Sequence, residues 1–350
     1  MFNRLLKPIV IIQLYLFIVS YFYNSDVNAL DTIELSCQQL NMQNWRLQQL
    51  QIQLLQLQHT PILQLSIGQL NLPQPFHDIQ LVKIRCSFFT WTKNTLNCQR
   101  GEGELHSKQF QSPRFQFSFQ ISPTHSAIHI EKLRLMDGII NMQAQLQQQQ
   151  QWQLDLKAQG LSLKILQQLF FPQLKLTSSQ IGLQAQLHGQ KQQLQKIKLD
   201  LDTEQLSLQT ADGTKASENL ALNLHLIAKQ INQRWLWENN LQIQQGHLYI
   251  DPLYIEITHL PIELQTQGYW NPKQSTIELN SAHFQHPNIG VIKAQAIIQT
   301  QPLHIKQAHI YLSIPELNTA SSIYLQPFIQ AGQFDGIALS GHLESHFKIQ

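Results

Sequence analysis

The sequence predicts a mainly β protein: a long, curled antiparallel β-sheet with a few short helices and an N-terminal transmembrane or signal helix. Two observations predict this fold. Apolar and polar residues alternate over most of residues 30–350, and turn-forming residues separate the alternating segments. Because successive side chains of a strand point to opposite faces, each segment has one apolar and one polar face. This pattern is typical of antiparallel strands that are covered on one side only.

The first 29 residues form a predicted targeting segment. Basic residues precede an apolar run over residues 8–23, and Val27 and Ala29 fit a small-residue cleavage site. A run of 16 residues is short for a spanning helix, which needs about 20. The segment is therefore a signal peptide cleaved after Ala29, an uncleaved signal anchor or, as a third alternative, a buried core helix. The first two alternatives place the rest of the chain outside the cytoplasm.

Alternating segments predict strands along the whole of residues 30–350, on the order of twenty to twenty-five of them. At three places two apolar residues follow each other directly, so the alternation shifts by one residue: Leu54–Leu55, Leu81–Val82 and Phe88–Phe89. Such a shift turns all later side chains to the wrong face of the sheet. We therefore expect a bulge or a strand end at each place. No Gly/Ser-rich linker interrupts the pattern, so one continuous domain is predicted. The clearest strands are residues 63–72, 115–121, 197–210, 220–228, 241–250 and 275–284.

Helical spacing is brief. It predicts a short helix over residues 161–172, stopped by Pro172, and a second over residues 314–332, interrupted by Pro327. The glutamine run Gln147–Gln151 lies between two alternating segments, so it is predicted to form the turn of a β-hairpin.

The amino-acid composition argues against a nucleic-acid-binding protein and against a disordered chain. Charged residues make up 13% of the chain, about half of the ~25% in an ordinary soluble protein, and 57 glutamines take their place. The net charge is +2 without a basic run, which argues against a nucleic-acid-binding protein. Leucine and isoleucine are abundant and regularly placed, which argues against disorder.

The cysteine, histidine and carboxylate residues of the sequence form no recognisable catalytic or metal-binding motif. An exported chain permits a disulfide. Cys86 and Cys98 flank a predicted hairpin and are the favoured pair, with Cys37 bound to either one as the alternative. No catalytic motif and no metal-ligand spacing occurs, so we expect neither an enzyme nor a cofactor. Asp200 and Asp202 are expected to be solvated on the polar face of one strand.

A long one-sided apolar sheet has to bury its apolar face, because a bare apolar surface aggregates. Three arrangements do so: a sandwich with a closed core, a closed barrel, and a sheet that curls around a bound ligand. The residues alone leave these alternatives open.

Three short segments carry a resemblance to a known family: "GHLYIDPLYIEI" (246–257), "SIYLQPFIQAGQFDGIALSGHL" (322–343) and "LNCQRGEGEL" (96–105). With these segments, a hydrophobic N-terminus and long alternating strands, the chain resembles the AsmA-like envelope proteins of the repeating-β-groove superfamily. Within that group it is most similar to the YdbH-type branch.

The resemblance implies a non-enzymatic protein of the Gram-negative envelope that carries phospholipid along an apolar β-groove between the inner and outer membranes. It implies a periplasmic domain anchored in the inner membrane through residues 8–23. Family members are longer, so three alternatives are open: a truncated copy, the N-terminal part of a longer family architecture, or a protein completed by a β-strand partner at its open sheet edge. An outer-membrane lipoprotein is the other expected partner.

The inward apolar side chains of the strands are the expected lining of this groove. The alternative function is that of an exported structural or assembly β-protein with a closed core and no lipid transport. The expected lining residues are Leu65, Ile67, Phe115, Phe117, Phe119, Leu154, Leu156, Leu199, Leu201, Leu222 and Leu224.

Overall fold

The structure of the protein is a computed structural model. The predicted N-terminal segment and all but the first two residues of the predicted helix 161–172 lie outside the residues that it describes. The described residues are 31–42, 45–57, 60–71, 79–107, 114–135, 137–162, 174–178, 180–258, 260–329 and 338–349.

The described residues form a mainly β protein, as predicted. Hydrogen bonding places 21 strands in one open antiparallel sheet, within the predicted number of strands. Among the described residues, no helix is both long enough and apolar enough to cross a membrane. The chain divides into two compact units, Met1–Ala158 with His188–Leu194 (unit 1) and Gln159–Leu187 with Gln195–Gln350 (unit 2). The prediction of one continuous groove domain stays a prediction.

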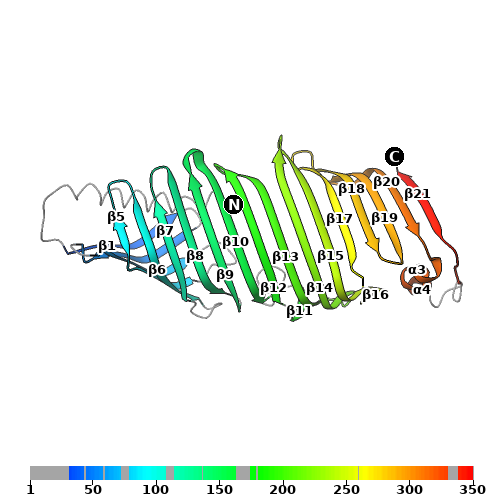
Figure 1. Cartoon of the computed structure of the whole chain (residues 1–350), viewed down its shortest axis with the longest axis horizontal. Helices are drawn as coiled ribbons and strands as arrows, with labels where there is room; N and C mark the ends of the chain where they lie inside the picture. The colour runs from blue at the N-terminus through cyan, green and yellow to red at the C-terminus, as the bar shows by residue number, and fades with distance from the viewer. Residues whose placement is uncertain are drawn as a thin grey trace. The chain divides into compact units, whose positions relative to one another are not determined.

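Unit 1 is a succession of antiparallel hairpins in which each strand pairs with the next along the chain, except that β4 and the short β5 both pair with β6. Figure 1 shows β5 to β9 side by side. Its strands before the glutamine run are β1 (Thr32–Met42), β2 (Trp45–Leu55), β3 (Ile62–Asn71), β4 (Ile79–Cys86), β5 (Phe89–Trp91), β6 (Leu96–Ser107), β7 (Arg114–Ile121), β8 (His125–Leu135) and β9 (Gly138–Gln147).

Unit 2 repeats this plan with longer strands: β13, β14 and β15 have 18, 17 and 17 residues. The two halves of β15 pair with different strands, β16 and β17. Figure 1 shows β17 to β21 following one another, with two short helices beside β20. The strands after the glutamine run are β10 (Gln151–Ser162), β11 (Leu174–Ser178), β12 (Gln180–Gln190), β13 (Gln193–Thr210), β14 (Lys215–Ile231), β15 (Arg234–Ile250), β16 (Leu253–Ile257), β17 (Ile262–Asn271), β18 (Thr276–His286), β19 (Gly290–Thr300), β20 (Leu303–Ile314) and β21 (Leu343–Ile349).

The predicted slips in the alternation fall at irregularities of the sheet. Strand β2 ends at Leu55, and β4 and β5 are separate strands on either side of Phe88. The register of β4 against β6 shifts between Ile79 and Leu81. Each slip is therefore absorbed by a strand end or a register shift, so that the apolar side chains stay on one face.

The glutamine run is a hairpin turn, as predicted. Strand β9 ends at Gln147, a single 3₁₀ turn, η2, covers Gln148–Gln150, and β10 begins at Gln151. The positive φ of 59° at Gln150 allows the chain to reverse in so few residues.

The second predicted helix forms two short pieces, α3 (Leu317–Tyr324) and α4 (Gln326–Ile329). The break falls at Leu325, two residues before Pro327, because a proline has no N–H to donate to the carbonyl four residues before it, which is that of Ile323 in the last turn of α3.

Candidate functional site

Unit 2 presents a continuous apolar face built from cross-strand rows of side chains. Residues directly opposite each other in an antiparallel pair lie on the same face. The pairing register therefore aligns one apolar residue from each of seven strands into a central row. In order from β13 to β20, that row is Leu201, Leu224, Leu241, Leu264, Phe284, Ile292 and Leu312.

Neighbouring rows widen this face. One side holds Thr203, Leu222, Ile243 and Ile262. The other side holds Leu199, Leu226, Asn239, Thr266, Ala282, Ala294, Ile310 and Phe347. A further row continues with Ala228, Trp237, Gly268, Leu279, Ala296, Ala308 and Ile349.

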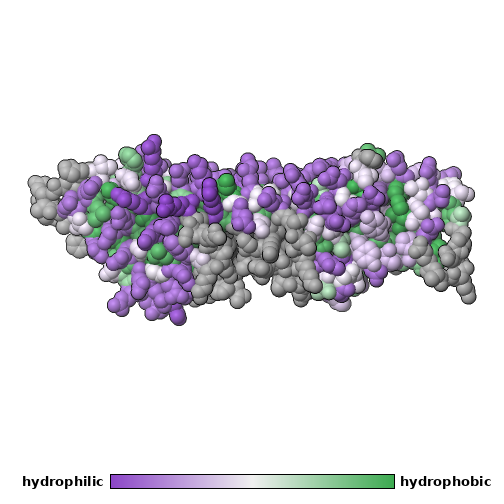
Figure 2. Space-filling model, turned by 90° about the horizontal axis from the view of Figure 1, so that it is seen from below, coloured by the Kyte–Doolittle hydropathy of each residue, from purple (hydrophilic) through white to green (hydrophobic). Residues whose placement is uncertain are grey.

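The side chains of the central row are only partly buried. Ile292 exposes 37% of its surface, and the other six residues of the row are half-buried. Seen from one side, hydrophobic patches lie between hydrophilic borders on the β18–β20 part of the unit (Figure 2). Six strand spacings of ~4.8 Å give the central row a length of about 29 Å. One leaflet of a bilayer core is about 15 Å thick, so the row is long enough for an extended acyl chain.

Three polar side chains interrupt the apolar face: Thr203, Asn239 and Thr266. Asn239 and Thr266 are cross-strand partners in the row beside the central one. Asn239 Oδ1 and Thr266 Oγ1 are enclosed, and neither has a hydrogen-bond partner in the described part of the chain. An enclosed polar atom without a partner costs about 1–3 kcal/mol. The pair is therefore a place where a hydrogen-bonding group of a bound molecule would be stabilised.

Helix α3 meets one end of the apolar face. His286, the last residue of β18, shares a face with Phe284 by strand alternation and is 9% exposed. Its Nδ1 is 2.7 Å from the hydroxyl of Tyr324 in α3. Burial lowers the pKa of His286 and raises the pKa of Tyr324. Both groups are therefore uncharged near neutral pH and compatible with an apolar surrounding.

Unit 1 differs because its apolar face forms packed clusters. One cluster joins seven residues that are each at most 9% exposed: Leu54, Leu63, Cys86, Phe89, Leu96, Cys98 and Phe117. A second cluster joins Ile67, Ile79 and Val82. Phe115 and Phe117 lie opposite glycines, and a Cβ on Gly103 or Gly101 would overlap the respective ring. The glycines thus let the two rings lie against the neighbouring strand.

The predicted disulfide between Cys86 and Cys98 is formed, with the two Cα atoms 6.0 Å apart, and Cys37 is a free thiol. Strand β5 and the start of β6 make the hairpin that brings the two cysteines together. Both cysteines are fully buried.

The predicted lining residues fall into two groups. Phe117 and Ile67 are buried in the clusters of unit 1, and Leu65, Phe115 and Phe119 pack against those clusters. Leu154 and Leu156 are half-buried in β10. The predicted residues of unit 2 are also half-buried and lie together on its apolar face: Leu199, Leu201, Leu222 and Leu224.

The structure adds residues to this face that the sequence did not single out. The central row also contains Leu241, Leu264, Phe284 and Ile292. The alternation over residues 241–250 and 275–284 was the available signal. Selecting these positions also requires the pairing register, which joins residues distant in the sequence.

The polar face of unit 2 carries ion pairs. Asp200 contacts His225 Nδ1, and its other oxygen is 3.8 Å from Lys198 Nζ. These side chains are about 40% exposed, so the pairs lie at the solvated surface, as expected for Asp200. No group of three metal-ligating side chains is assembled among the residues that the structure describes.

Comparisons with protein-family models, with curated proteins and with solved structures find no match to this chain.

Proposed function

We propose that the protein binds the acyl chains of a phospholipid on the apolar face of unit 2 and carries phospholipid between the inner and outer membranes of a bacterial envelope. The observation that carries this proposal is the seven-strand row from Leu201 to Leu312, which is apolar throughout and only partly buried. Each acyl CH₂ that leaves water on such a face gains about 0.8 kcal/mol. Binding of this kind depends on a continuous surface and requires no catalytic residue.

The cellular setting belongs to the same proposal. The apolar run over residues 8–23, preceded by basic residues, supports an anchor in the inner membrane or export by a cleaved signal. The resemblance to AsmA-like envelope proteins supports a periplasmic location for the β-sheet. An outer-membrane lipoprotein, or a β-strand partner at an open edge, would then receive the lipid.

A second candidate function is a structural or assembly role with a closed core. The packed cluster around Cys86 and Phe117 in unit 1 favours it, because these side chains leave no apolar surface for a ligand. The two candidates differ in what they expect of unit 2: a lipid on its apolar face, or coverage of that face by protein.

Lipid extraction tests the proposal. Residues 30–350 are expressed with an export signal, purified without detergent and examined by native mass spectrometry and by lipid analysis of an organic extract. Phospholipid bound in a fixed molar ratio is the expected result. Protein that is folded by circular dichroism, monomeric and free of lipid would contradict the proposal and favour the closed-core alternative.

A further inference from the structure

The polar face of unit 2 holds a shallow groove with a positively charged lining. The groove has a volume of about 610 Å³ and is formed by β18, β19, β20 and β21. Five basic side chains line it: His283, Lys293, His309, His346 and Lys348. No carboxylate is among its lining residues. The other lining residues are Ser281, Gln295 and Tyr311, together with four members of an apolar row: Ala282, Ala294, Ile310 and Phe347.

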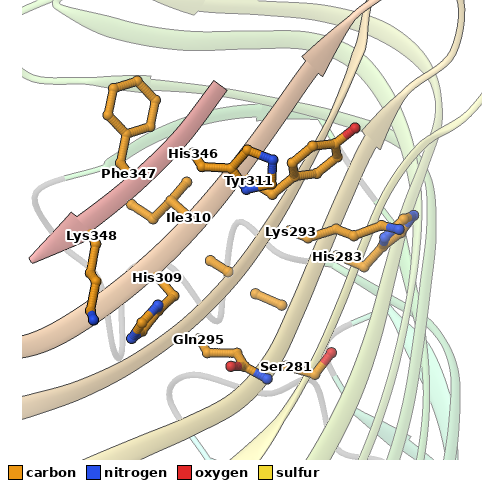
Figure 3. Close-up of a pocket in the computed structure, with 12 residues that line it drawn as sticks. Ser281, His283, Lys293, Gln295, His309, Ile310, Tyr311, His346, Phe347 and Lys348 are labelled. Carbon is orange, nitrogen blue, oxygen red and sulfur yellow. The ribbon is translucent and has the colours of Figure 1, made fainter. Parts of the chain in front are cut away.

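The pairing register arranges these side chains in two adjacent rows. His283, Lys293, Tyr311 and His346 lie directly opposite one another on four consecutive strands. The ring centroids of Tyr311 and His346 are 4.8 Å apart. The second row, two residues along each strand, runs through Gln295, His309 and Lys348. Figure 3 shows Lys293 beside His283, and Lys348 near His309.

This arrangement places basic side chains opposite each other. Lys293 faces His283, and Lys348 faces His309 across neighbouring strands. Each lysine adds a positive charge to a groove whose lining holds no carboxylate. Among the described residues, none of the five basic side chains is ion-paired with a carboxylate. An anion in the groove would supply the missing negative charge.

We infer that this groove binds a phosphate group. A phosphate presents several acceptor oxygens to donors from different strands, and charge-assisted hydrogen bonds of this kind are the strong ones. The hydroxyl of Ser281 and the amide of Gln295 add neutral donors around the basic groups, whereas the Tyr311 hydroxyl donates to Glu344. A cation is disfavoured, because no metal-ligand group is assembled among the described residues.

Two carboxylates on the same face oppose the positive charge of the groove. Glu344 accepts a hydrogen bond of 3.4 Å from the Tyr311 hydroxyl, and Glu263 lies on β17 opposite Gln285. Neither carboxylate is among the residues that line the groove.

The experiment titrates the full chain with inorganic phosphate by calorimetry at neutral pH, and saturable binding is the expected result. The double variant K293Q/K348Q should weaken this binding by tenfold or more, because it removes two charged donors. The control K196Q/K229Q removes an equal charge from another cross-strand lysine pair of the same unit and should change the affinity by less than about twofold.

A second experiment distinguishes free phosphate from the phosphate of a lipid headgroup. Flotation with phosphatidylcholine vesicles, with and without phosphatidic acid, tests a lipid headgroup. Binding of inorganic phosphate supports a site for the group itself, and binding of phosphatidic acid vesicles alone supports a headgroup site. Equal losses in the two lysine variants, or binding to neither probe, would overturn the inference. The inference does not rest on the acyl-chain proposal, because inorganic phosphate has no acyl chain.

Discussion

Cys86 and Cys98 close a short loop inside the most deeply buried cluster of unit 1, at a sequence separation of 12 residues. A cross-link restricts the unfolded chain, and a loop of about 15 residues contributes about 3 kcal/mol. The cross-link also fixes the β5–β6 hairpin against β4, where the alternation of the sequence slips.

Removal of this disulfide should therefore destabilise the protein. The double variant C86S/C98S is expected to lose about 3 kcal/mol of unfolding free energy, measured by urea denaturation. C37S is the matched control, because Cys37 is a free thiol in β1, and it should unfold like the unaltered protein. An equal loss in both variants would show that the cross-link is not the cause.

Protonation of His286 makes the stability of the folded protein depend on pH. Burial lowers its pKa, so the folded state takes up a proton at a lower pH than the unfolded chain does. Above the unfolded value of about 6.5, neither state is protonated and stability does not depend on this group. Below that value the unfolded chain binds the proton first, so stability falls with pH and levels off below the folded-state pKa.

The acid side of the stability profile should accordingly change in H286Q. In the unaltered protein, the urea midpoint is expected to decline as the pH falls from about 6.5. In H286Q the decline should be shallower, while H304Q, which alters an exposed histidine, should keep the original slope. A profile that H286Q leaves unchanged would contradict the role assigned to His286.

Strand alternation acts at the scale of the elements. In β14, Leu222 lies on the apolar face opposite Ile243, and the next residue, Asn223, lies on the polar face opposite Asp202. Substitutions at two adjacent positions of one strand therefore test the two opposite faces of the sheet. Phe117 is a less suitable site for such a comparison, because a charge in its packed cluster would disrupt folding.

A charge on the apolar face should displace lipid. L222K is expected to lower co-purifying phospholipid about tenfold, whereas N223K, with the same added charge on the other face, should retain it. Lipid is quantified per mole of folded protein, with folding checked by circular dichroism. If L222K reduces folding, L222Q replaces it. Equal lipid loss in the two variants would contradict binding on this face.

At the scale of the whole molecule, the two units bury their apolar faces to different extents. Unit 1 buries its face in clusters of at most 9% exposure, whereas the central row of unit 2 remains half-buried. The difference follows from which residues meet. In unit 1, two phenylalanine rings over glycines and a disulfide pack into clusters. In the central row of unit 2, six of the seven residues are leucine or isoleucine side chains that stand side by side.

A ligand that covers the apolar face of unit 2 should stabilise the whole chain. Lipid-free protein is expected to gain about 2.7 kcal/mol of stability from dodecylphosphocholine at about one hundred times its Kd, below the micelle concentration. Glycerophosphocholine has the same headgroup without an acyl chain and should have no effect. The readout is the thermal unfolding midpoint. Equal shifts with both compounds would show that the acyl chain is not what binds.

Much of this architecture was predictable from local sequence pattern. The period of two identified the strands of both units, the slips marked the strand end at Leu55 and the separation of β4 and β5, and the glutamine run marked the hairpin turn. The Cys86–Cys98 pair followed from the predicted hairpin between the two cysteines. These features depend on neighbouring residues, whose geometry is set within a few positions along the chain.

The sequence by itself determined that each strand has an apolar and a polar face, because side-chain direction alternates within a single strand. Only the tertiary structure decided which apolar residues meet, and hence that Phe117 is buried while Leu224 stays half-exposed. It also decided that His283, Lys293 and His346, up to 63 positions apart, share one polar row. The physical reason is that pairing register and burial depend on contacts between distant strands, which no local period specifies.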